Sequence, residues 1–333
     1  MKKFLIIQTA FIGDVVLATS LIEKLHKHFP FAEIDFLLRK GNESLFIGHP
    51  YLHEVLIWDK TKNKLRNLLK MLKLIRRKNY DVVINVQRFA ATGFLTAFSG
   101  ATEKIGFDKN PFSFFFTKKV KHIISDEKNA KHEIERNDDL IKDFTDDVIV
   151  KPVLYPTASD EAAVKVYKAF SYITVSPASV WFTKQYPKEK WISFINKIPP
   201  SYTVFLIGSS ADTDLAEQIK NQSTHEWVIN LCSKLSFLKS AALMKDAVMN
   251  YVNDSAPMHF ASAVNAPVTA VYCSTLSSFG FGPLSDESYI VETKEKLSCR
   301  PCGLHGRKAC PLGHFNCAQT INDEQLSATL PLN

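Results

Sequence analysis

The sequence predicts an α/β protein built from two similar domains, each with a doubly wound parallel sheet. Short apolar runs alternate with amphipathic helical segments along both halves of the chain, a pattern typical of βαβ units. Polar turns follow several of these runs, as expected at the carboxyl edge of a parallel sheet. The chain has 333 residues, which is long for one domain and suits two.

The amino-terminal half opens with a predicted strand at 3–8, an amphipathic helix at 15–28 and a second strand at 34–38. The spaced glycines of a dinucleotide-binding turn are missing. Gly13 permits an unusual backbone angle or a close backbone approach. Asp14 stands at the predicted N-cap of the helix, where capping is the simplest role for its carboxylate.

A strongly basic helix is predicted at 60–78, between strands at 55–58 and 81–86. It contains nine Lys or Arg residues and no acidic residue, with leucines at helical spacing. One interpretation is a solvated surface face. The other is a docking surface for an anionic lipid headgroup or a membrane face.

A helix at 89–98 and a turn at 106–109 complete the predicted elements of this half. The stretch 146–159 contains two prolines and little periodicity, which favours an interdomain linker. The predicted domains are therefore residues 1–155 and residues 156–333.

The carboxyl-terminal half begins with a predicted strand at 172–176 and a polar loop that carries Ser179, Thr183 and Lys184. Hydroxyl groups and a compact ammonium ion can bind a phosphate at the end of a strand. The next strand ends at Gly208. An acidic residue just beyond it is well placed for ribose hydroxyls; we choose Asp212, with Asp214 as the alternative.

A strand at 248–252, the polar turn Asn253-Asp254-Ser255 and a helix at 257–264 follow. Asp254 or Ser255 can cap this helix, and a proline lies in its first turn. The free N–H groups and the helix dipole would favour an anion there. The alternative is an ordinary capped turn, with His259 as a satisfied helix histidine.

Composition excludes several classes of protein. Hydrophobic residues make up 46% and charged residues 23% of the chain, as in ordinary globular proteins, and the net charge of +7 favours anionic partners. No apolar run approaches the roughly 20 residues that span a bilayer. The apolar start breaks at Gln8 and is read as a strand rather than a signal peptide. We therefore expect a cytoplasmic protein with reduced or metal-bound cysteines.

Four motifs in order resemble glycosyltransferase family 9, the ADP-heptose:lipopolysaccharide heptosyltransferases. Asn253-Asp-Ser-x-Pro-Met-His259 with its Ala-rich helix is similar to one family motif, and the segment 9–19 resembles the amino-terminal one. The segment 177–187 is similar to Pro-x-Ser-x-Trp-x-x-Lys-x-Trp-Pro, with Tyr186 where Trp is usual. A cysteine tail at 299–317 is the fourth, and the resemblance covers nearly the whole chain.

The resemblance implies the GT-B type of fold, two Rossmann-like domains facing a central cleft. Residues 1–155 would bind the acceptor and residues 156–333 the nucleotide sugar. Asp14 corresponds to the proposed catalytic base, and Lys184 is assigned to the donor diphosphate. The other residues assigned to donor binding are Gly13, Ser179, Thr183, Gly208, Asp212, Asn253, Asp254, Ser255 and His259.

The implied reaction is inverting transfer of heptose from ADP-heptose to the lipopolysaccharide inner core without a metal, in the manner of a heptosyltransferase II. The implied partners are a nucleotide-sugar donor, an anionic glycolipid acceptor and the inner face of the inner membrane, where the protein would bind peripherally. No nucleic acid is expected.

The cysteines and the rival functions leave alternatives open. Cys299, Cys302, Cys310 and Cys317 have zinc-like spacing in isolation. The family does not need a metal for catalysis, so we expect packed thiols, with structural zinc as the alternative.

Rival functions are transfer from another nucleotide sugar, a zinc-containing nucleic-acid-binding protein and an NAD-linked oxidoreductase.

Overall fold

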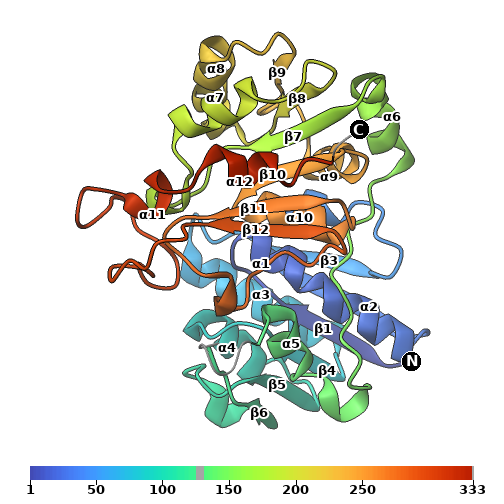
Figure 1. Ribbon diagram of the computed structural model, residues 1–333. Helices are drawn as coiled ribbons and strands as arrows, with labels where there is room; N and C mark the ends of the chain where they lie inside the picture. Colours follow the sequence, from blue (N-terminus) through green and yellow to red (C-terminus); the bar gives the residue numbers. More distant parts are fainter. Residues whose placement is uncertain (125–130, 332–333) are drawn as a thin grey trace. The chain divides into compact units, whose positions relative to one another are not determined.

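The computed structural model describes residues 1–124 and 131–331, which form two compact units. Unit 1 ends at Tyr155 and unit 2 begins at Pro156. Within the described residues each unit contains one six-stranded parallel sheet (Figure 1). None of the described helices is both long enough and apolar enough to cross a membrane.

The sheet of unit 1 has the strand order β3-β2-β1-β4-β5-β6, so the chain starts at its centre and winds outward in both directions. Its order reverses between β1 and β4, which pair in parallel. Such a switch point is where open α/β sheets bind ligands. The strands are β1 (Lys3–Ile7), β2 (Glu33–Arg39), β3 (Glu54–Trp58), β4 (Val82–Asn85), β5 (Glu103–Phe107) and β6 (Lys118–Val120).

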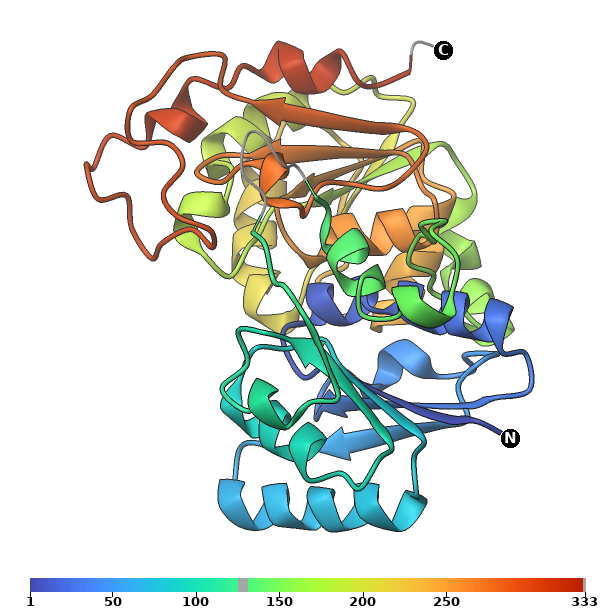
Figure 2. The ribbon, with the colours of Figure 1, turned by 90° about the horizontal axis from the view of Figure 1, so that it is seen from below.

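Helices cover both faces of this sheet. On one face α3 packs beside α4 (Figure 2). Their apolar side chains join Leu5, Ile7 and Leu37 in a core cluster. On the other face α2 contacts both α1 and α5. The helices are α1 (Ile12–Leu17), α2 (Thr19–His28), α3 (Lys64–Lys78), α4 (Ala90–Ala97) and α5 (Glu133–Asp138).

Three predictions for unit 1 are wrong. The basic helix predicted at 60–78 begins only at Lys64, because Asn63 before it has a left-handed backbone with a φ of 47°. The helix at 15–28 is two helices that meet at Ala18, where the hydroxyls of Thr19 and Ser20 donate to the carbonyls of Val16 and Leu17 at 2.7 and 2.9 Å. Such local bonds compete with the regular helical ladder. The turn at 106–109 starts too early, because Gly106 lies within β5. A Cβ there would lie 2.5 Å from the ring of Phe116, so glycine serves close packing rather than a turn.

The sheet of unit 2 has the order β12-β11-β10-β7-β8-β9, which repeats the topology of unit 1. Its switch point lies between β7 and β10. Both units therefore have the predicted Rossmann-like, doubly wound topology. The strands are β7 (Tyr172–Ser176), β8 (Thr203–Leu206), β9 (Val228–Asn230), β10 (Met249–Asn253), β11 (Val268–Tyr272) and β12 (Ser288–Glu292).

The core of unit 2 is rich in aromatic side chains. Trp191 and Phe194 from α7 pack with Tyr251 from β10, and α8 and α12 complete the same face. On the other face α9 contacts α6 and α10. The helices are α6 (Ala158–Val164), α7 (Lys188–Asn196), α8 (Thr213–Gln222), α9 (Phe237–Lys245), α10 (Ala256–Ala263), α11 (Asn316–Gln319) and α12 (Asp323–Ser327).

Candidate functional site

The switch point of unit 2 brings together the two motifs that carry the predicted donor site. Lys184 follows β7 in the short 3-10 helix Phe182–Lys184, and Asp254 follows β10. The ammonium Nζ of Lys184 lies 2.7 Å from Oδ2 of Asp254. The side chains of Lys184 and Asp254 are 16% and 9% exposed, so the pair is largely buried at the edge of the sheet. The same Oδ2 accepts a 2.6 Å hydrogen bond from the hydroxyl of Thr275.

Asn253 fixes the shape of the loop that carries Lys184. Its Oδ1 accepts the backbone N–H of Tyr186 at 2.9 Å, and its Nδ2 donates to the carbonyl of Pro177 at 2.8 Å. Asn253 is fully buried, so these bonds satisfy an amide that would otherwise be costly to bury. Ser179 lies in the same loop, where its carbonyl accepts Nε2 of Gln185 at 2.6 Å. The side-chain amide of Asn253 thus holds the Lys184 loop in place.

The amino terminus of α10 differs in detail from the prediction. Ser255 is the N-cap, but its side chain makes no capping bond; its hydroxyl donates to the carbonyl of Asn253 at 3.3 Å. The N–H of Asp254 extends the sheet by donating to the carbonyl of Val271. The amide of Asp254 is therefore already bonded within the sheet. Within the described residues, the N–H groups of Ser255 and Ala256 donate to no protein acceptor.

The predicted site residue Thr183 anchors the cysteine tail. Its Oγ1 accepts the hydroxyl of Ser274 at 2.9 Å and the N–H of Arg307 at 2.7 Å, and the side chain is buried. Gly306 lies directly against the stem of Lys184 with a φ of +76°. A Cβ at Gly306 would come within 2.8 Å of Cγ of Lys184, so only glycine fits.

Gly208 and Asp212 lie after β8, the strand beside β7. Oδ2 of Asp212 accepts both the N–H and the hydroxyl of Ser209 at 2.7 Å, which completes a capping box. A Cβ at Gly208 would come within 2.9 Å of the same oxygen, so this glycine makes room for the turn. His259 lies one turn into α10 and is buried. Because its carboxylate completes the capping box, Asp212 has a structural role whether or not it binds ribose.

Asp14 lies in the first turn of α1, after β1 in unit 1. The prediction that Asp14 is the N-cap is wrong. Phe11 occupies that position with an extended backbone, and no side chain caps the helix. Gly13 is helical, so it does not adopt the unusual backbone angle considered above. Asp14 therefore does not have the capping role that its place in the sequence predicted.

Lys60 was predicted as part of the basic helix at 60–78, but it lies before α3 and has an environment that the sequence did not predict. Thr9 follows β1 at the switch point of unit 1. Its N–H and its hydroxyl donate to Oε1 of Gln87 at 3.1 and 2.5 Å. Nζ of Lys60 lies 2.6 Å from the hydroxyl of Thr9 and 4.6 Å from the ring centre of Trp58. Burial, and then the nearby charge of Arg39, lower the pKa of Lys60 to about 8. Only the spatial meeting of separate strands reveals this environment.

The four tail cysteines are neighbours, and none of the six cysteines in the chain forms a disulfide within the described residues. Cys317 is buried in the core of unit 2, where burial and then the neighbouring thiols raise its pKa to about 11. Burial also raises the pKa of Cys302, with further contributions from Cys299 and Cys310. Within the described residues, no three of the tail sulfurs converge closely enough to form a group that could hold a metal ion.

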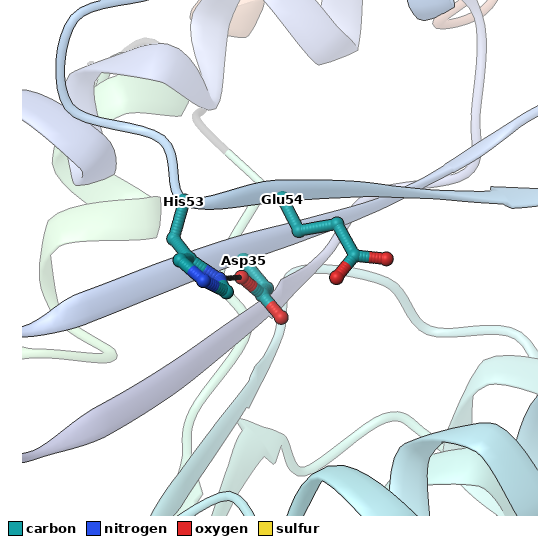
Figure 3. A group of neighbouring side chains, drawn as sticks. All are labelled: Asp35, His53 and Glu54. Atoms are coloured by element: carbon teal, nitrogen blue, oxygen red, sulfur yellow. Dashed lines mark hydrogen bonds and ion pairs between the residues drawn. The ribbon is translucent and has the colours of Figure 1, made fainter.

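One other cluster has the residue types of a metal site. Asp35, His53 and Glu54 meet near the amino ends of β2 and β3 (Figure 3), and they are the one such group of three found among the described residues. Asp35 is buried and accepts Nδ1 of His53 at 2.8 Å and the hydroxyl of Tyr80 at 2.5 Å. The ammonium of Lys78 pairs with both Asp35, at 3.2 Å, and Glu54. Lys78 thus already supplies the cation that balances these carboxylates.

Comparison with known proteins gives a consistent result. The model of "Glycosyltransferase family 9 (heptosyltransferase)" matches residues 68–310. Lipopolysaccharide heptosyltransferase 3 of Escherichia coli is 26% identical over 283 residues, covering 80% of this chain and 82% of that protein.

Two solved structures share the fold. That of a glycosyltransferase family 9 protein from Veillonella parvula superposes with a TM-score of 0.82 at 19% identity, covering 98% of this chain and 95% of the other. That of the E. coli ADP-heptose LPS heptosyltransferase II gives a TM-score of 0.78 at 20% identity, covering 99% and 98%. These neighbours and the two Rossmann-like units confirm the predicted GT-B type of fold.

Proposed function

The chain belongs to glycosyltransferase family 9 and is a glycosyltransferase, and from this we propose that it transfers heptose from ADP-heptose to the inner core of lipopolysaccharide. The rival reading as a zinc-containing nucleic-acid-binding protein is set aside by the family membership. The donor is suggested by the name of the E. coli structural neighbour, and the acceptor by the names of both E. coli relatives. Those two relatives carry out differently numbered steps, so the acceptor sugar is left open, and a heptosyltransferase II-like step stays a hypothesis.

The observation that carries the proposal is the pair of Lys184 and Asp254 at the switch point of unit 2. Lys184 would bind the donor diphosphate and stabilise the negative charge that grows on it as the glycosidic bond breaks. Asp254 holds the ammonium in place before the donor arrives. The N–H groups of Ser255 and Ala256 at the start of α10 would add two hydrogen bonds to the same anion.

In the proposed reaction Asp14 is the general base. It takes the proton of the acceptor hydroxyl while that oxygen forms a bond to the anomeric carbon of the donor. The bond from the anomeric carbon to the diphosphate breaks at the same time, and ADP leaves with the electron pair. Attack from the face opposite ADP inverts the anomeric configuration. Neither Asp14 nor Lys184 needs a metal for these roles, so the proposal includes none.

The remaining donor contacts are assigned by their place at the two sheet edges. Four of these residues lie in or beside the Lys184 loop and α10: Ser179, Thr183, Asn253 and His259. Two others follow β8, where the ribose would bind: Gly208 and Asp212. Gly13 shares the first turn of α1 with Asp14. Thr183, Asn253 and Asp212 would act mainly by shaping the protein, since their polar atoms already bond within it.

The proposed acceptor is an anionic glycolipid, and the proposed location is the cytoplasm, with peripheral binding at the inner face of the inner membrane. No nucleic-acid partner is proposed. The net charge of +7 is consistent with an acceptor that carries phosphate and carboxylate groups.

A ligand screen tests the proposal. We expect ADP-heptose and ADP to raise the melting temperature of the purified protein, and UDP-sugars, NAD and oligonucleotides to leave it unchanged. Incubation with ADP-heptose and a core-truncated lipopolysaccharide should then release ADP. Stabilisation by a UDP-sugar with no response to ADP-heptose would instead favour the alternative donor and contradict the proposal.

A further inference from the structure

Helix α3 of unit 1 carries an unbalanced group of positive charges. Its sequence from Lys64 to Lys78 has no acidic residue. Lys78 pairs with Asp35 and Glu54, but no ion pair within the described residues joins any other cation of the helix to a carboxylate. The cations without an acidic partner are Lys64, Arg66, Lys70, Lys73, Arg76 and Arg77. Ordinary solvated helices usually intersperse both signs of charge.

The same helix exposes leucines beside those cations. Its inward face is held by Met71 and Ile75, which are buried against the sheet. Leu65 is 69% exposed and Leu69 is 49% exposed. Leu69 and the partly buried Leu72 line a shallow surface hollow together with Lys73, Arg76 and Arg77. Figure 2 shows α3 along the outer side of the sheet of unit 1, with no described element of that unit over its outer face.

A second group of exposed apolar side chains lies at the end of α4 and in the short 3-10 helix Ser113–Phe115. Phe98 at the end of α4 contacts Phe115 with ring centres 5.6 Å apart, and Phe115 contacts Phe114 at the same separation. Phe114 is 84% exposed, so this aromatic group continues to the surface rather than into the core. Phe rings of this kind lie favourably at the boundary between headgroups and acyl chains.

We propose that the outer face of α3 is a docking surface for an anionic lipid bilayer. Leucines flanked by cations, on a helix whose opposite side is buried in its own domain, fit a helix lying in the plane of the membrane interface. The leucines would enter the headgroup region while lysine and arginine side chains contact lipid phosphates. The choice of a bilayer over an acidic protein rests on the proposed function, since a glycolipid acceptor is reached at a membrane.

Vesicle binding tests this surface directly. The variant Lys70→Gln, Lys73→Gln, Arg77→Gln removes three exposed cations of α3. A matched control, Lys234→Gln, Lys294→Gln, Lys296→Gln, removes the same charge from exposed positions of unit 2. Each lysine or arginine near an anionic surface strengthens binding about fivefold, so the α3 variant should partition into phosphatidylglycerol-containing vesicles on the order of a hundredfold more weakly than the control.

Two further measurements separate the contributions of the leucines and of the cations to vesicle binding. The double variant Leu65→Gln, Leu69→Gln keeps every charge and should lose about tenfold or more in vesicle binding, because its apolar contacts are gone. Wild-type binding should weaken between about 0.1 M and about 1 M salt, as the Debye length falls from about 10 Å to about 3 Å. Phosphatidylcholine vesicles should bind much less at both salt concentrations.

The outcomes are distinguishable from a failure of the proposed reaction. Stabilisation by ADP should be the same in the α3 variant and in the wild type, because the variant leaves unit 2 untouched. Equal vesicle binding by the α3 variant and its control would overturn the docking surface, whatever the donor is. A wild-type dimer that the α3 variant loses, without any vesicle binding, would make this face an interface between copies and would also overturn the proposal.

Discussion

The ammonium of Lys184 is 2.7 Å from the carboxylate of Asp254, although the two residues come from different βα loops of unit 2. The loop after β7 and the loop after β10 thus present an ion pair at the point where the strand order reverses. A donor diphosphate that binds Lys184 must share the ammonium with Asp254. The site is therefore preorganised: the cation is held in position, and little side-chain entropy remains to be lost on binding.

Replacing Lys184 by alanine should weaken donor binding and slow transfer, because the charge that Lys184 neutralises grows toward the transition state. The loss of one charge-assisted hydrogen bond typically costs about 1.5–3 kcal/mol, so ADP affinity should fall about 10- to 100-fold. Titration calorimetry and the rate of ADP release measure the two effects. Lys188→Ala, four positions along the same segment, is the matched control and should leave both unchanged. Wild-type affinity and turnover in Lys184→Ala would remove this lysine from the site.

Replacing Asp254 by asparagine should have opposite effects on stability and on ADP binding. Without its partner, the largely buried ammonium of Lys184 is unbalanced, so the free energy of unfolding should fall by about 1–3 kcal/mol. Asparagine can still accept the hydroxyl of Thr275. Because the diphosphate no longer competes with a carboxylate, ADP should raise the melting temperature of the variant more than that of the wild type. If both proteins unfold at the same temperature and respond equally to ADP, the pair does not control the site.

Lys60 should titrate well below the ordinary lysine value of 10.5, since burial and then the charge of Arg39 lower its pKa to about 8. Burial disfavours the charged form of Lys60 in the folded protein, which lowers the free energy of unfolding at pH values below about 8. As pH rises from about 8 toward the ordinary value of 10.5, the folded protein loses this proton before the unfolded chain does, so the free energy of unfolding should increase. Pulse acetylation followed by mass spectrometry should give a half-point near pH 8 for Lys60. A half-point for Lys60 near the ordinary value of 10.5 would show that its environment is not the one described.

The cysteine tail should contain no metal. Among the described residues, the group of three ligand atoms close enough to hold a metal ion is Asp35, His53 and Glu54, so no three of the tail sulfurs converge in that way. Protein purified without chelator should hold well under one equivalent of zinc or iron by elemental analysis, and chelators should not change its melting temperature. About one equivalent of metal, together with a lower melting temperature after chelation, would contradict packing and establish a structural metal site.

Much of the fold follows from periodicity. Buried strands such as β1, β7 and β10 are continuous apolar runs followed by polar turns, and they lie where the pattern predicts. The strand β12 was missed because its burial is partial, with Tyr289 and Ile290 exposed at the edge of the sheet. The break at Ala18 was missed because the hydroxyl bonds of Thr19 and Ser20 leave the apolar period of the two helices unchanged.

The candidate site was predicted less completely. The resemblance to family 9 assigned Lys184 and Asp254 to one donor site, but it did not reveal that they pair. The sequence also placed Asp14 at the cap, since Asp is a frequent N-cap residue and Phe11 is not. The environment of Lys60 depends on Thr9, Gln87 and Trp58, which are distant in sequence and meet only in the folded sheet.

The central claim is that Asp14 removes the proton of the acceptor hydroxyl, and Asp14→Asn tests it most directly. Asparagine keeps the size of the side chain, and the loss of one charge in the first turn of α1 should change stability by less than about 1 kcal/mol. It cannot take up a proton, and loss of a general base typically costs about 10²–10⁴ in rate. Asp147→Asn, an exposed carboxylate of the same unit, is the matched control and should transfer at the wild-type rate.

The measurement is the rate of heptose transfer from ADP-heptose by the Asp14→Asn variant, with ADP affinity determined on the same preparation. The account predicts a rate at least about a hundredfold below wild type with ADP binding unchanged. A variant that keeps more than about a tenth of the wild-type rate would contradict it, since a general base contributes far more than that.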